Sequence, residues 1–263
     1  HEVVVQTLLN HGADVNIQKK RGGTALIIAS QEGHEAIVRD LLAKDADVNV
    51  QRNDGFTALM MASQDGYTAV VLALLGKGAE INHQTESGIT ALYMASQNGY
   101  EEIVLALLDK GAEIDHQAEI GFTALYVASQ QGHETIVQAL LAKNADANIR
   151  NKQGATALYI ASRQGHEAVV LALLAEGTEI NHQTANGFTA LLAASQRGHE
   201  AVVLALLDTG AETNYRAGNG VTALFMASQN GHVEIVLALL DKGVEINQQA
   251  GNGATALFIA SHR

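Results

Sequence analysis

The sequence predicts an all-α solenoid, in which short helix pairs stack side by side and β-turn fingers project between them. The deciding observation is an internal repeat, because the tripeptide Thr-Ala-Leu returns every 33 residues. A glycine lies two residues before each of these threonines, a second glycine follows nine residues after the threonine in every complete unit, and a Leu-Leu pair closes the unit. The threonines are Thr24, Thr57, Thr90, Thr123, Thr156, Thr189, Thr222 and Thr255.

The first helix of each unit is predicted from its end signals. In the unit that runs from 54 to 84, Thr57 is a good N-cap because its hydroxyl can accept a hydrogen bond from the free amides of the first turn. We expect a helix over residues 58–64. Gly66 should end it, because glycine adopts the left-handed conformation without steric cost.

The second helix of the same unit is predicted over residues 68–75, where apolar side chains recur at helical spacing. Those that share one face are Val70, Val71, Leu74 and Leu75. Gly78 should end this helix, and an extended stretch then leads to the next threonine. One helix pair is too small to bury its own apolar face, so its stability has to come from stacking on neighbouring pairs.

The repeat also predicts the domain organisation. We expect a single array over residues 1–263, with a partial repeat at 1–19, seven full repeats at 20–250 and a partial repeat at 251–263. Residues 1–9 should form the tail of a second helix, and residues 257–259 should lie in a first helix. Stacked arrays normally end in polar capping repeats, so we expect this array to continue beyond the given ends.

The pattern resembles the ankyrin repeat. The features that carry the resemblance are G-x-T-x-L-x-x-A at the first helix, Gly-His between the helices and G-A-D/E-x-N after the second helix. One departure is that the family's Thr-Pro-Leu-His becomes Thr-Ala-Leu-x, which keeps the helix propensity but gives up the preset φ of proline. The resemblance covers essentially the whole chain and implies a stack of helix pairs that binds other proteins.

Composition excludes several classes of protein. With 16 basic and 28 acidic residues the formal net charge is −12, which argues against nucleic-acid binding. The absence of cysteine excludes disulfide scaffolds, zinc ribbons and a cysteine nucleophile. The longest apolar stretches, such as 168–175, are far shorter than the roughly 20 residues of a spanning helix, and no signal peptide opens the chain. We therefore expect an intracellular, cytoplasmic monomer that binds no membrane.

The recurring histidines raise the question of a metal site. Those that follow the mid-repeat glycine are His34, His133, His166, His199 and His232. Stacked helices lie roughly 8–10 Å apart, whereas bonds from nitrogen to zinc are only about 2 Å long, so equivalent histidines cannot share an ion. We interpret them as histidines that lie between helices and hydrogen-bond the backbone.

Other candidate chemistry is equally weak. The recurring serines, from Ser30 to Ser261, lack the G-x-S-x-G elbow of a nucleophile, and we expect small packing residues with satisfied hydroxyl groups. No glycine-rich phosphate loop is present, and the carboxylates occupy repeat positions without a unique cleft. We expect no enzyme, no cofactor and no metal.

The resemblance to ankyrin repeats implies that a partner protein or peptide lies along the concave face, against the fingers and the ends of the first helices. The finger positions that it implies include Asp54, Phe56, Ser87, Ile89, Ile120, Phe122, Gln153, Ala155, Asn186 and Phe188. The helix-end positions are Gln64, Asp65, Gln97, Asn98, Gln130, Gln131, Arg163, Gln164, Gln196 and Arg197.

Aromatic residues recur along this surface. The finger phenylalanines Phe56, Phe122 and Phe188 appear in every second repeat. They are either exposed anchors for a partner or rings that lie on the neighbouring finger, and both alternatives are open. A tyrosine ladder is interpreted as partly buried packing, and its members are Tyr93, Tyr126 and Tyr159.

Charge is uneven along the chain. Residues 53–118 hold nine acidic side chains against Lys77 and Lys110, a net charge of 2 − 9 = −7. We hypothesise that a basic partner segment favours these two repeats through faster association, with Asp54, Asp65 and Glu86 as contacts. The alternative is a solvated surface on which repulsion maintains solubility.

A leucine stripe runs along the second helices, where many ankyrin repeats place a charged residue. Its members are Leu72, Leu105, Leu171, Leu204 and Leu237. This position lies beside the main apolar face of the helix. We favour flank packing against adjacent repeats over a second contact surface.

The most concrete function that follows is a non-catalytic scaffold for protein–protein interaction. Two alternatives remain open. One is a structural spacer or spring, which the near-uniform repeats favour, and the other is a regulatory arm within a larger multidomain protein.

Overall fold

The computed structural model describes residues 1–262. Contacts between residues divide the chain into two compact units, unit 1 (His1–Glu119) and unit 2 (from Ile120 onward). In both units short helices alternate with long loops, and the residues described contain no β-strand beyond one isolated bridge between Gln51 and Thr57. The predicted all-α architecture is confirmed.

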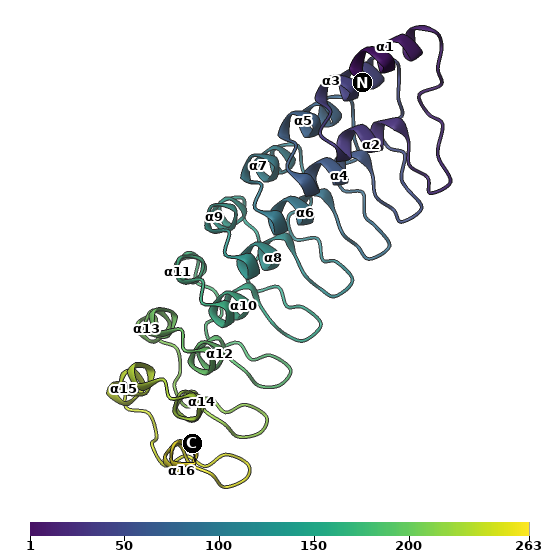
Figure 1. Ribbon diagram of the computed structural model, residues 1–263. Helices are drawn as coiled ribbons and strands as arrows, with labels where there is room; N and C mark the ends of the chain where they lie inside the picture. The colour runs from purple at the N-terminus through teal and green to yellow at the C-terminus, as the bar shows by residue number, and fades with distance from the viewer. Residues whose placement is uncertain (263) are drawn as a thin grey trace. The chain divides into compact units, whose positions relative to one another are not determined.

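Unit 1 is a stack of helix pairs in which first helices lie on first helices and second helices on second helices, with the loops projecting to one side (Figure 1). Its first helices are α2 (Ala25–Gln31), α4 (Ala58–Asp65) and α6 (Ala91–Asn98). Its second helices are α1 (Glu2–Asn10), α3 (Glu35–Ala43), α5 (Thr68–Gly76) and α7 (Glu101–Asp109).

Unit 2 repeats the arrangement (Figure 1). Its first helices are α8 (Ala124–Gln131), α10 (Ala157–Gln164), α12 (Ala190–Arg197), α14 (Ala223–Asn230) and α16 (Ala256–Ser261). Its second helices are α9 (Glu134–Ala142), α11 (Glu167–Ala175), α13 (Glu200–Asp208) and α15 (Val233–Asp241). The predicted partial repeats are also helical, since α1 is a second helix and α16 a first helix.

The predicted end signals of the first helix are confirmed in α4. The hydroxyl of Thr57 accepts a hydrogen bond from the amide of Met60 at 3.3 Å, and Gly66 ends the helix in the left-handed conformation with φ of 82°. The second helix α5 runs one residue further than predicted, to Gly76, and Lys77 is its C-cap. Gly78 follows with φ of 82°, so the left-handed turn begins after the cap.

Polar backbone groups connect neighbouring repeats within each unit. In unit 2 the finger amide of Ala185 donates to the carbonyl of Gln153 at 2.9 Å, and the next finger repeats this bond from Gly218 to Asn186. On the loops after the second helices, the side-chain oxygen of Asn148 accepts from the amide of Glu179 at 2.9 Å. These bonds set each repeat in register with the next.

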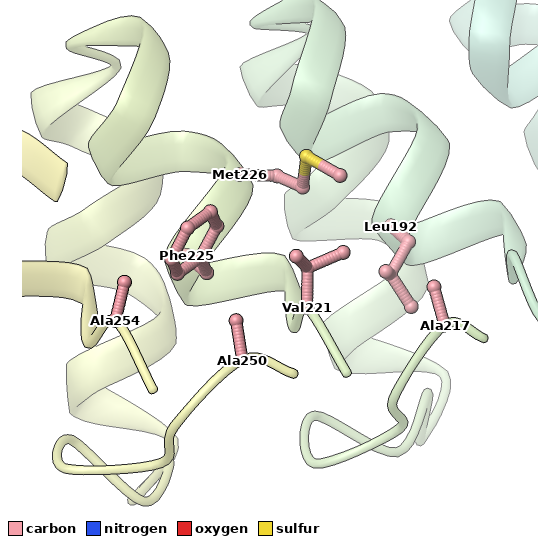
Figure 2. Close-up of a cluster of buried hydrophobic side chains, with 7 residues drawn as sticks. All are labelled: Leu192, Ala217, Val221, Phe225, Met226, Ala250 and Ala254. Carbon is pink, nitrogen blue, oxygen red and sulfur yellow. The ribbon is translucent and has the colours of Figure 1, made fainter. Parts of the chain in front are cut away.

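The apolar core follows both helix layers. In α11 the side chains of Val169, Val170 and Leu173 are buried, and Leu173 has no exposed surface. Burial of a leucine of this kind stabilises the fold by about 1.5–3 kcal/mol. Figure 2 shows a further cluster at the base of two successive fingers of unit 2. Its members are Leu192, Ala217, Val221, Phe225, Met226, Ala250 and Ala254.

The serine prediction is half wrong. Six of the serines in this position are fully buried, as expected of packing residues, but their hydroxyl groups have no hydrogen-bond partner among the residues described. Ser228 is half-buried, and Ser261 is exposed and donates to the carbonyl of Phe258 at 2.9 Å. The six buried serines are Ser30, Ser63, Ser96, Ser129, Ser162 and Ser195. The close packing of alanine-rich first helices leaves room for the side chain but supplies no polar group to it.

Over residues 1–262, every helix is too short or too polar to cross a lipid bilayer.

Candidate functional site

The structure places the predicted partner-binding residues on two kinds of element, the fingers and the C-terminal ends of the first helices. A finger is the turn before each first helix, such as residues 151–155, where the amide of Gly154 donates to the carbonyl of Asn151 at 2.9 Å. The exposed predicted residues are Asp54, Glu86, Asn98, Gln131, Gln164 and Arg197. The half-buried ones are Phe56, Gln64, Asp65, Ile89, Gln97, Phe122, Gln130 and Phe188.

In unit 1 the finger residues Asp54 and Phe56 share a neighbour. The guanidinium of Arg52 pairs with the carboxylate of Asp54 at 2.8 Å and lies 6.0 Å from the ring centroid of Phe56. Arg52 stands one residue outside the span 53–118 whose charge was counted above. Part of the negative charge predicted for this surface is therefore balanced within the finger itself.

The helix ends of unit 1 are also connected to one another. The side-chain amide of Asn98, at the end of α6, donates to the carbonyl of Gln64 in α4 and to the carbonyl of Met94, both at 3.1 Å. The side chain of Gln64 donates to the carboxylate of Asp65 at 3.4 Å. Asn98 is thus held in place by the preceding repeat, which gives this edge of the surface a defined shape.

In unit 2 the ring of Phe122 stacks on the ring of Tyr126, with centroids 4.3 Å apart and an angle of 13° between the planes. Tyr126 belongs to the first helix of the same repeat. Neither alternative foreseen for the phenylalanines therefore describes Phe122, which is not a free anchor and lies on its own helix. Tyr126 is buried while Tyr93 and Tyr159 are half-buried, which confirms the ladder as packing.

A groove of about 510 Å³ opens between two fingers and the first helices of unit 2. Its floor holds the aromatic side chains of Tyr126, Tyr159 and Phe188. Among the partner-binding positions that the resemblance implies, those that line it are Gln153, Ala155, Asn186, Phe188, Arg163 and Gln196. Finger and helix-end residues of unit 2 therefore converge on one surface.

Charge at this groove is positive. Lys152 and Arg163 line it, and both are exposed. Partial burial raises the pKa of the Tyr159 hydroxyl above its ordinary 10.0, while the nearby cations Arg163 and Arg197 act in the opposite direction. Both guanidinium groups are therefore close enough for their field to reach the groove floor.

Three of the five mid-repeat histidines, His166, His199 and His232, hydrogen-bond the backbone, as predicted. The ring nitrogen Nε2 of His166 donates to the carbonyl of Gln130 at 3.0 Å, and that of His199 donates to the carbonyl of Arg163 at 3.1 Å. The histidines of the connecting segment behave similarly, since Nε2 of His182 lies 2.8 Å from the finger carbonyl of Gly154. In the part of the chain that the structure describes, no group of three or more potential metal ligands gathers.

The prediction that the leucine stripe packs against adjacent repeats is wrong. Leu171 is 48% exposed and Leu72 is 53% exposed, and the other members are exposed as well. The helices stack through the valine and leucine face, and the stripe position projects past it into solvent.

Sequence reasoning missed Lys152 and placed the tyrosines in packing alone. Lys152 occupies the finger position that Asn53 has three repeats earlier, directly before the position of Asp54. A comparison of the repeats position by position would therefore have identified it as a surface residue. No sequence signal placed it on the same groove as Arg163, because the two residues lie in different elements and the turn of the finger brings both to one surface.

Comparison with known proteins agrees with this geometry. A family model described as ankyrin repeats (3 copies) matches in overlapping segments that together span residues 1–263. The chain belongs to the ankyrin repeat family. Ankyrin repeats generally mediate protein binding and are typically non-catalytic.

Among solved structures, the ankyrin array is similar to the crystal structure of the human ASB11 ankyrin repeat domain. The two share 28% sequence identity with a TM-score of 0.77, over 85% of this chain and 99% of the other. A comparison with curated proteins finds no match.

Proposed function

We propose that this ankyrin array is a non-catalytic scaffold that holds a segment of a partner protein against its fingers and first helices. The observation that carries the proposal is the groove of unit 2, because six of the positions that the resemblance to ankyrin repeats implies for partner binding line it. Aromatic side chains on a rigid support are well suited to anchor a partner at low cost in conformational entropy. A cytoplasmic location, a monomeric state and a single array over residues 1–263 remain predictions from the sequence.

The acidic surface of unit 1 supports a second contact, with a basic partner segment. Glu86 is exposed and Asp65 is half-buried, whereas Asp54 already pairs with Arg52. Charge reversal of Asp54, Asp65 and Glu86 should therefore slow association and weaken its salt dependence, with Glu86 contributing most. Unchanged affinity and salt dependence would remove the basic partner from consideration.

The scaffold is tested by crosslinking from defined positions. A photoreactive amino acid is placed at Gln153, Asn186 or Gln196 on the proposed surface, and at Gln138 on the second helix α9 as the matched control, since all four positions are polar and exposed. The 263-residue chain is then irradiated in a cell lysate and its adducts are identified by mass spectrometry. A common adduct from the first three positions and none from Gln138 supports the proposal.

A structural spacer is the second candidate, favoured by the recurrence of glutamine at one helix position. The glutamines are Gln31, Gln64, Gln97, Gln130, Gln196 and Gln229. A surface diversified for one partner should vary more. If a folded chain yields no specific adduct from any position, the spacer replaces the scaffold.

A further inference from the structure

We propose that the groove of unit 2 binds an acidic peptide segment, an extended stretch of a partner protein in which Asp or Glu side chains flank an apolar side chain. The proposal rests on the scaffold function and names the chemistry of its ligand at this site. It concerns a different surface, and the opposite charge, from the acidic repeats of unit 1.

The first support is the distribution of charge within unit 2. From Ile120 to residue 262, the fingers and first helices carry the cations Lys152, Arg163 and Arg197 and no acidic residue. All eleven acidic residues of this span lie in the second helices or in the loops that follow them. Unit 2 is therefore negatively charged as a whole but presents only positive charge at the groove.

The second support is that these three cations have no internal partner. Within the described part of the chain, Lys152, Arg163 and Arg197 form no ion pair with an acidic side chain. Two cations elsewhere in unit 2 do form ion pairs, Arg150 with Glu179 at 2.9 Å and Lys242 with Asp208 at 3.0 Å, and Arg216 donates to the carbonyl of Gln249 at 2.7 Å. A carboxylate that enters the groove thus meets the guanidinium of Arg163 and the ammonium of Lys152, neither of which has to break an existing ion pair first.

The third support is the apolar floor beneath the cations. Tyr159 and Phe188 are half-buried and line the groove, so each still presents part of its ring to the opening. Protein interfaces usually have an apolar core enriched in aromatic residues, with a polar rim around it. An apolar side chain of the ligand would contact the rings, and its acidic neighbours would reach Arg163 and Lys152, since arginine can bind a carboxylate with two parallel hydrogen bonds.

The neighbouring hollow shows what the cations add. Two repeats further on, a hollow of about 410 Å³ is lined by Val221, Phe225 and Ile259 among others, and no charged side chain lines it. It has the same finger-and-helix construction but no means of selecting a charged ligand. Selectivity for acidic peptides should therefore depend on residues 152–197 alone.

A short acidic peptide fits this surface better than a nucleic acid. Three cations offer few phosphate contacts, and the net charge of −12 would repel a long polyanion from the rest of the chain. A segment of a few residues places its carboxylates at the groove and leaves the acidic surfaces of unit 2 untouched. Binding should weaken as salt rises, because the cations are exposed.

The test is selection from a displayed random-peptide library on the full 263-residue chain. The same selection is made on the triple variant K152Q/R163Q/R197Q and on the control variant R150Q/K242Q, which removes two cations outside the groove. An enriched peptide is then measured by fluorescence anisotropy beside its isostere with Gln and Asn in place of Glu and Asp. Circular dichroism establishes that each variant is folded.

We expect acidic peptides with an apolar residue to be enriched on the unaltered chain and on the control variant, but not on the triple variant. The triple variant should bind the enriched peptide at least tenfold more weakly, and the amide isostere should show a similar loss. Enrichment without acidic bias, equal binding of the isostere, or an equal loss in the control variant overturns the inference. So does tighter binding of a single-stranded oligonucleotide at the groove. If crosslinking at Gln153 and Asn186 still captures a partner, the scaffold stands and only the acidic ligand is lost.

Discussion

The imidazole ring of His166 lies against the α-carbon of Gly132 in the preceding repeat. A methyl group added to this glycine would stand 2.6 Å from Nδ1 of His166, closer than any carbon of that kind is found in proteins. The backbone of Gly132 has φ of 79°, which also favours glycine. Its position in the repeat is thus determined both by the helix end and by the ring of the next repeat.

Replacement of Gly132 by alanine should therefore cost more stability than replacement of a glycine with the same backbone but open surroundings. We expect G132A to lose about 2–4 kcal/mol, from the left-handed backbone and the clash together. G177A, with φ of 70° and nothing within 4 Å of the added carbon, should lose only about 1 kcal/mol from its backbone. Urea unfolding followed by circular dichroism measures both. The double variant G132A/H166A should regain the part of the stability that the clash costs, because the ring is removed. Equal losses of stability in G132A and G177A would contradict the argument.

Ser129 offers a stabilising change. Its hydroxyl is fully buried and has no hydrogen-bond partner in the described structure. Alanine at this position therefore removes the desolvation cost of the hydroxyl without breaking a hydrogen bond. We expect S129A to be neutral or more stable by about 1 kcal/mol, measured by urea unfolding. S162A is an independent repetition at the same position of the next repeat. A loss of stability in both variants would show that the hydroxyl is satisfied after all.

The leucine stripe should contribute little to stability. Leu171 is 48% exposed, so L171Q should change the free energy of unfolding by less than about 0.5 kcal/mol. Leu173 lies two residues away in α11 with no exposed surface, and L173A should cost about 2–5 kcal/mol. Thermal unfolding of the two variants compares them directly. A large loss in L171Q would restore the flank packing that the sequence favoured.

Tyr159 should titrate at higher pH than an ordinary tyrosine. Partial burial disfavours its anionic form and raises its pKa above 10.0, so the stability linked to this group is present below pH 10 and lost as pH rises through the folded-state pKa. Absorbance of the tyrosinate ion, with Y159F subtracted, measures the midpoint. Arg163 lowers this pKa, so R163Q should raise the midpoint further. A midpoint that falls or stays unchanged in R163Q would place the guanidinium away from the ring.

Much of the fold could be predicted because its signals are local. Thr57 and Gly66 define the ends of α4 through hydrogen bonds and backbone angles within one turn, and the structure has both as expected. The role of His166 was also predictable, because equivalent positions in stacked repeats are too far apart to share a metal ion but close enough to reach a neighbouring carbonyl.

The candidate site was predictable only in part, because it depends on how side chains of different elements are directed. Phe122 lies in the expected finger, but its stacking on Tyr126 follows from the angle between that finger and α8. The exposure of Leu171 depends on which face of α11 meets the adjacent helices, and a helical wheel leaves a position at the border undecided.

The sequence by itself determined the repeat, the order and ends of the helices and the family, because a 33-residue period imposes the same short-range contacts in every unit. Only the tertiary structure decided which surface is polar, apolar or charged at a given place. Lys152, Arg163 and the ring of Tyr159 come from a finger and a helix of one repeat, and Phe188 comes from the next finger. Their convergence on one groove depends on the turn of the finger and on the stacking of α10 and α12. The sequence alone does not predict the directions of side chains that result from this turn and this stacking.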